Sequence, residues 1–113
     1  MRKQQIENAA FDVATQVRTV EDSIDSALAE IAELQGRMMY CRSVTSMGIA
    51  TGHDSLQHLA NALQGLVSAR GGMANCHAAL VNAKQLVPGL RTVAFGDTNE
   101  CPKTAQVDLR VVA

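Results

Sequence analysis

A chain of 113 residues has the length of a single domain, because either half alone would bury too little surface to fold. Apolar residues make up 47% of the chain but aromatic residues only 3%, so any interior must be built from aliphatic side chains and Met, as in helices packed on helices. The net charge of −1 lacks the basic excess that nucleic acids and acidic membranes usually require, and we expect neither as a partner.

The first predicted element is a long helix over about residues 3–41. Its apolar residues recur in steps that alternate between four and three, at Ile6, Ala10, Val13, Val17, Val20, Ile24, Ala27, Ile31, Leu34, Met38 and Cys41. Such a heptad repeat, sustained over five heptads, indicates a helix of the coiled-coil type that contacts a partner helix along one stripe.

Residues 43–52 are rich in Ser, Thr and Gly and predict a turn, after which a second helix is predicted over about residues 55–87. Asp54 fits its N-cap, Gln57 would complete a capping box, and a Pro-Gly pair follows its end. The apolar seam of this helix alternates large and small residues, at Leu59, Ala62, Leu66, Ala69, Met73, Cys76, Leu80 and Ala83. The small members would allow a neighbouring helix to approach closely.

The second helix also contains Gly65, Gly71 and Gly72. Each costs about 1 kcal/mol relative to Ala in a helix interior. A closely packed neighbour would explain Gly65 and Gly72, whereas Gly71 falls on the outer side of the helix, so the Gly71-Gly72 pair could instead mark a kink.

The second helix carries few charges, and its apolar face is widened by Leu63, Val67 and Val81 beyond what one neighbouring helix can cover. We therefore predict a homodimer in which two antiparallel helical hairpins form a four-helix bundle. The predicted fold class is mainly all-α, with residues 1–89 as the helical hairpin.

Residues 90–113 differ in pattern and predict an extended tail or a small β-hairpin. Val107, Leu109 and Val111 alternate with polar residues, which is typical of a strand with one covered face, and residues 91–95 could pair with it. We expect this tail to lie outside the helical core, so that truncation after Gly89 leaves the helices intact.

The side chains that could support chemistry do not form a known pattern. The three His and three Cys residues lack the short paired spacing of a zinc site, and no phosphate-binding loop, nucleophile elbow or zinc-protease motif occurs. Cys41 and Cys76 lie on the seams and are expected to pack as small hydrophobes, whereas Cys101 lies in a polar loop. The sequence predicts no enzyme activity, no metal and no cofactor. The odd number of cysteines and the apparent lack of an export signal predict a cytoplasmic protein with reduced thiols.

The acidic residues of the first helix lack the pattern of a di-iron or catalytic cluster, and a solvated helix face explains them better. They are also the candidate partner-facing patch, which comprises Glu21, Asp22, Asp25, Glu30 and Glu33. The function expected from these features is that of a non-catalytic homodimeric interaction, scaffold or regulatory module that binds a protein partner. The alternative is a small helical chaperone or carrier that shelters an apolar segment along the small residues of the second helix.

Overall fold

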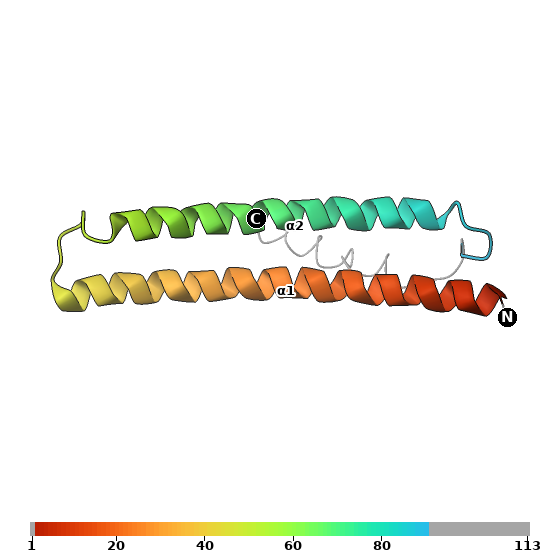
Figure 1. The fold of residues 1–113 in the computed structure, drawn as a ribbon, viewed down its shortest axis with the longest axis horizontal. Coiled ribbons are helices and arrows are strands. Elements are labelled where there is room, and N and C mark those ends of the chain that lie inside the picture. Colours follow the sequence, from red (N-terminus) through yellow and green to blue (C-terminus); the bar gives the residue numbers. More distant parts are fainter. Residues whose placement is uncertain (1, 91–113) are drawn as a thin grey trace, which may run out of the picture. The chain divides into compact units, whose positions relative to one another are not determined.

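The computed structural model describes residues 2–90, which form two helices, α1 (Arg2–Thr45) and α2 (His53–Lys84), joined by a short loop (Figure 1). The helices run antiparallel and pack against each other, which confirms the predicted all-α hairpin. The predicted strand and Cys101 lie outside the described residues, and the dimer stays a prediction.

Helix α1 continues past the predicted end at Cys41. The Thr45 hydroxyl donates to the Cys41 carbonyl at 2.8 Å within the last turn. The helix ends where Ser46 adopts a left-handed backbone with φ of 54°. This conformation at the residue after a helix turns the chain away from the helix axis.

The prediction that Asp54 caps α2 is wrong by two residues. The Leu56 amide donates to the Gly52 carbonyl at 3.1 Å, which makes Gly52 the cap, and its φ of 79° suits glycine. Asp54 instead lies in the first turn, where its negative charge favours the helix N-terminus. The predicted capping box is not formed, because the Gln57 side chain donates forward to Asn61 at 3.4 Å.

Helix α2 continues as one helix through Gly71 and Gly72 and ends at Lys84, before the predicted end at residue 87. Beyond Lys84 the amides of Gln85, Leu86 and Val87 donate to carbonyls three residues earlier, so the chain tightens into turns. The Pro-Gly pair follows, with Gly89 at φ of 90°.

Residue contacts divide the chain into two units. Unit 1 combines the chain up to Val17 with the chain from His77 onward, of which residues 2–17 and 77–90 are described, and unit 2 is Arg18–Cys76. In unit 1 the side chain of Leu90 is only 5% exposed. The boundary between the helical hairpin and the tail after Gly89 stays a prediction. In unit 2 no residue is buried, and its contacts are made by half-buried side chains.

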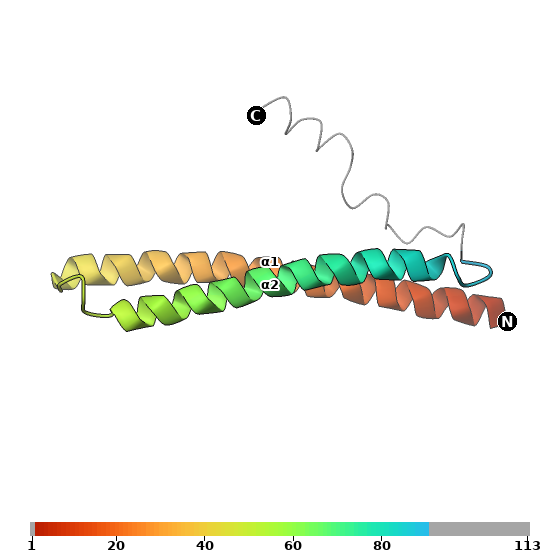
Figure 2. The ribbon, with the colours of Figure 1, turned by 90° about the horizontal axis from the view of Figure 1, so that it is seen from above.

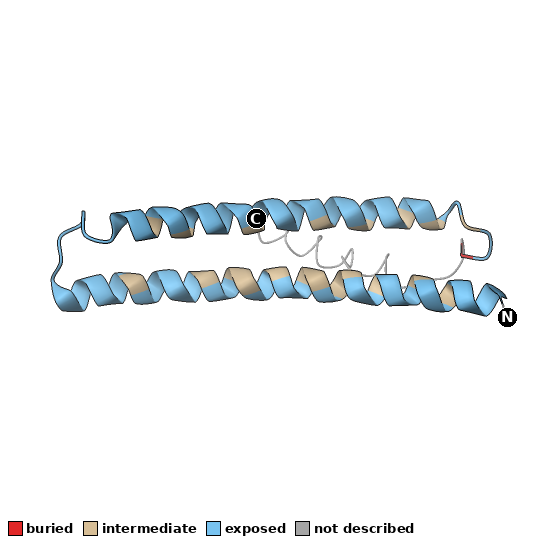
Figure 3. Cartoon of the chain, viewed as in Figure 1, coloured by how far each residue is buried: buried red, intermediate tan, exposed pale blue. Residues whose placement is uncertain are grey.

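The half-buried positions of both helices lie on the sides that face each other (Figure 3). On α1 they include the predicted stripe positions Ala10, Val17, Val20, Ile24, Ala27, Ile31 and Met38. Ile6, Val13, Leu34 and Cys41 belong to the same stripe and remain exposed, whereas the neighbouring line of Glu7, Ala14, Glu21 and Leu28 is half-buried. The contact with α2 is therefore rotated toward one edge of the apolar stripe, and the other edge is uncovered.

Candidate interaction surfaces

The predicted seam of α2 divides into two sets. Leu59, Leu66 and Met73 are half-buried in unit 2. The remaining seam residues are exposed, and they are Ala62, Ala69, Cys76, Leu80 and Ala83. Within unit 2, the large seam residues thus make the contact with α1, and Ala62, Ala69 and Cys76 lie beside it.

Three glycines of α2 accompany these small residues, and nothing within residues 2–90 packs against them. A Cβ atom built at Gly65, Gly71 or Gly72 would meet no atom within 4 Å, apart from the helix's own backbone. Close packing within the hairpin therefore does not explain why glycine occupies these positions. At 100° per residue, Gly65 and Gly72 fall with Ala62, Ala69 and Cys76 within roughly 80° of the helix circumference. We call this strip the small-residue face of α2.

Asp25 and Glu33 of the predicted acidic patch each form an ion pair. In unit 2, Asp25 Oδ1 accepts a hydrogen bond from Arg70 Nε at 2.8 Å, and this pair joins α1 to α2. The hydrogen bond to Asp25, its charge and that of Glu21 raise the pKa of Arg70 above its ordinary value. Glu33 accepts from Arg37 at 2.9 Å within α1.

The five acidic residues also do not share one face. At 100° per residue they spread over roughly half of the α1 circumference, with Glu21 and Asp25 near α2 and Glu30 on the outer side. The ion pair of Arg70 with Asp25 was not predicted from the sequence. Arg70 is one of the few charged residues of the second helix, and it lies opposite the acidic first helix. This pattern was the signal in the sequence that could have predicted the ion pair.

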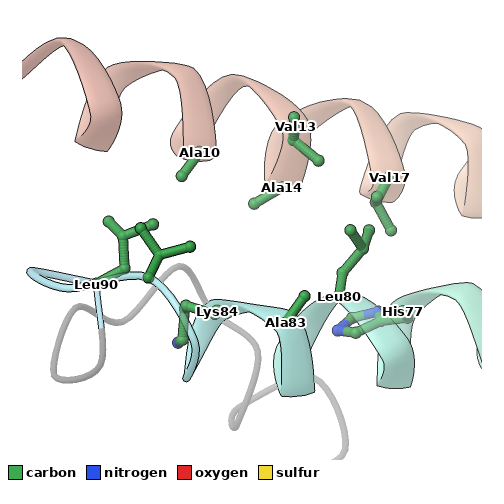
Figure 4. A pocket seen from close by; sticks show the side chains of 10 residues that line it. Ala10, Val13, Ala14, Val17, His77, Leu80, Ala83, Lys84 and Leu90 are labelled. Atoms are coloured by element: carbon green, nitrogen blue, oxygen red, sulfur yellow. The ribbon is translucent and has the colours of Figure 1, made fainter.

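Unit 1 contains an apolar groove between its two helical segments, with a volume of about 220 Å³. Figure 4 shows Ala10 and Ala14 of α1 directed toward Leu80 and Ala83 of α2 across this gap. The groove exists because these alanines are too short to meet. Its lining is completed by Val13, Val17, His77, Lys84, Val87 and Leu90. Ala14 and Leu90 were not predicted as contact residues, and only the turn after α2 brings Leu90 there.

The two described cysteines, Cys41 and Cys76, are exposed free thiols rather than packed side chains of the single hairpin. Among residues 2–90, no three His, Cys, Asp or Glu side chains gather in a way that could hold a metal ion. Neither described helix has an apolar stretch long enough to cross a membrane. No protein-family model, curated protein or solved structure matches the chain.

Proposed function

We propose that the chain is a non-catalytic interaction module that acts as a homodimer of helical hairpins and binds a protein partner. The observation that carries this proposal is that neither α1 nor α2 contains a buried residue, although both carry a continuous apolar repeat. Folding a chain of this size requires burial of more than half of its unfolded surface. A second copy, which is always present at equal concentration, would supply the cover that the described helices lack.

Two uncovered surfaces support a symmetric partner. One is the small-residue face of α2, and the other is the edge of the α1 stripe that includes Ile6, Val13 and Leu34. Because a two-fold axis pairs each surface of one copy with its complement on the other, two hairpins can cover both surfaces in a four-helix bundle. A stable interface of this kind typically buries about 1,200 to 2,000 Å² in total.

The protein partner would bind outside this bundle core. Asp22 and Glu30 are exposed on α1, and an acidic surface of this kind selects basic or polar partners by charge complementarity. The tail beyond Leu90 is the second proposed attachment point. Scaffolding or regulation through such contacts needs neither a metal nor a cofactor.

Multi-angle light scattering at micromolar concentration tests the homodimer. Two copies of the 12.0 kDa chain should give about 24 kDa. A well-folded species of 12.0 kDa that retains a full helical circular dichroism signal would contradict the proposal, because the helices would then be stable without a second copy.

The groove in unit 1 favours a second candidate function, a small chaperone or carrier that shelters an apolar segment. Apolar side chains dominate its lining, and a groove between helices is a common place for apolar cargo. A fluorescent dye that binds apolar surfaces distinguishes the two functions. The proposed dimer should not bind the dye. A carrier should bind it when empty and should lose that binding on Ala14→Leu, which fills the groove.

A further inference from the structure

The apolar groove of unit 1 lies where the described chain ends. Leu90 lines this groove and is the one buried side chain of residues 2–90. Figure 2 shows the turn after α2 beside the first turns of α1, and a Cβ atom built at Gly89 would lie 3.9 Å from Lys3 Cε. The continuation of the chain, residues 91–113, therefore starts at one end of the groove.

The groove suits an apolar occupant of limited size. Its lining is apolar except for His77 and Lys84. Within this lining Val13 and Leu80 are still 49% and 38% exposed, so an occupant that removes them from water would stabilise unit 1. Aliphatic cavities of roughly 150 Å³ hold a benzene molecule. A groove of about 220 Å³ can therefore hold one aromatic ring and a smaller aliphatic side chain.

The first residues after Leu90 match the groove in length and composition. Figure 4 shows Leu90 and Ala10 at one end of the groove and Val17 at the other. The two ends are roughly 10 Å apart, because Val17 follows Ala10 by seven helical residues. Three extended residues cover roughly the same distance. Val93 and Phe95 follow Leu90 by three and five residues, so both can reach the groove, and their spacing of two places them on one side of an extended chain.

The charge at the start of this segment also matches the end of the groove. Glu7 is half-buried and precedes Ala10 by three residues, so both lie on the same side of α1. Arg91 follows Leu90 directly, and residues 92–95 carry no charge. A segment that enters the groove from Leu90 thus brings its positive charge to the end of the groove that has a carboxylate.

We propose that residues 91–95 of the same chain occupy the groove of unit 1, with Val93 and Phe95 inserted between Ala14 of α1 and Ala83 of α2. The covalent link through Leu90 holds the segment near the groove at an effective concentration on the order of millimolar. An apolar cargo must displace this segment, so the tail regulates access to the groove. The proposal does not depend on the homodimer, and it leaves the rest of the tail available to a protein partner.

Tryptophan fluorescence of the full-length protein tests this proposal, since the chain contains no Trp of its own. Emission of the Phe95→Trp variant should lie at shorter wavelength in buffer than in urea. Adding Ala14→Leu fills the groove, expels the indole and should shift the emission in buffer to longer wavelength. The matched control is Ala9→Leu, because Ala9 is exposed on the same helix and does not line the groove. This control should leave the emission unchanged.

A second filling variant, Ala83→Leu, approaches the groove from α2 and should shift the emission as Ala14→Leu does. If either variant lost its helical circular dichroism signal, the other would decide. Emission of Phe95→Trp that lies at the unfolded wavelength already in buffer overturns the proposal. Emission that neither filling variant changes also overturns it, and places residue 95 in another contact, such as a hairpin with residues 106–112 or an interface with a second copy. Light scattering tests the homodimer separately, so either inference can fail alone.

Discussion

Unit 1 and unit 2 are built from the same two helices, but they differ in how far a single chain buries their apolar side chains. In unit 1 the turn after α2 returns Leu90 to the helices, and this side chain is buried at 5% exposure. In unit 2 no residue is buried, and in the described part of the chain nothing packs against Gly65 and Gly72 of the small-residue face. The difference indicates that a helical pair becomes self-sufficient only where a third segment covers it. Unit 2 is therefore where the proposed second copy would contribute most.

The largest effect should follow from removing the segment that covers unit 1. Leu90→Ala deletes the one side chain of residues 2–90 that is buried, and we expect it to lower the free energy of unfolding by about 2 to 4 kcal/mol. The control is Leu86→Ala, because Leu86 is 80% exposed and its truncation should cost little. Urea denaturation followed by circular dichroism measures both. Equal midpoints for the two variants would show that Leu90 does not stabilise unit 1.

Leu90 also determines what we expect when the tail is removed. A chain that ends at Leu90 should keep its helical signal, whereas one that ends at Gly89 should lose stability by an amount close to that of Leu90→Ala. The sequence pattern predicts Gly89 as the end of the helical domain, and the two truncations test whether the buried Leu90 belongs to that domain.

The next effect concerns the open face of unit 2. Ala69 and Ala29 are both exposed in the single chain, so a monomer would accommodate Leu at either position. A second copy packed on the small-residue face would penalise only Ala69→Leu, by about 1 to 3 kcal/mol, because extra methylenes in a packed interface force the backbones apart. Thermal melting and light scattering of the two variants give the answer. If both behaved like the unmodified protein, the small-residue face would not be the dimer interface.

The helices could be predicted from the sequence because a heptad repeat is a local signal. Their ends were less predictable: the true cap of α2 is Gly52, which has no side-chain oxygen and so lacks the signature that Asp54 carries. The contact face was predicted at every second stripe position, such as Ala10, Val17 and Ile24 on α1. Several of the stripe positions between these residues are exposed, because a single neighbouring helix contacts a line narrower than the apolar stripe. The sequence does not indicate which edge of the stripe that helix contacts.

The candidate sites depend on contacts between distant residues and were less predictable still. Arg70 and Asp25 are far apart in sequence, and only the register of the two helices brings them together. The groove of unit 1 requires Leu90 to return after a turn in which Gly89 adopts φ of 90°. The sequence shows that residues 39–49 include several apolar side chains, but it does not show that they are exposed, because a partly buried loop would have the same composition.

A smaller effect on the free energy of unfolding is expected from the glycines of unit 2. Whether Ala stabilises or destabilises the protein at a glycine shows whether that glycine lies on open surface or in an interface. Gly71→Ala should raise the free energy of unfolding by about 0.5 to 1 kcal/mol, because Ala restricts the unfolded chain and has open space around its Cβ. Gly72→Ala would give the same gain in a monomer. On a closely packed small-residue face it should give no gain or a loss. Melting curves that showed equal stabilisation would argue against close approach at Gly72.

The smallest effect is expected from the ion pair that joins the helices of unit 2. Arg70 and Asp25 are largely exposed, so solvent and salt screen their attraction, and Arg70→Gln should lower the melting temperature less than any change above. Because Asp25 raises the pKa of Arg70, the stabilisation is present below the ordinary pKa of arginine and is lost only as the pH rises through the raised value. Titration of Arg70 should therefore contribute no pH dependence near neutrality, whereas the loss caused by Arg70→Gln should shrink as salt is added.

The matched control for this pair is Arg37→Gln, which removes an exposed pair within α1 alone. A pair within one helix supports only that helix, whereas the Arg70 pair also favours one alignment of α2 against α1. Only Arg70→Gln should therefore reduce the protection of α2 amides in unit 2 from hydrogen exchange, since a less firmly aligned hairpin opens more often. Equal exchange in the two variants would mean that the half-buried apolar contacts alone set the register of the hairpin.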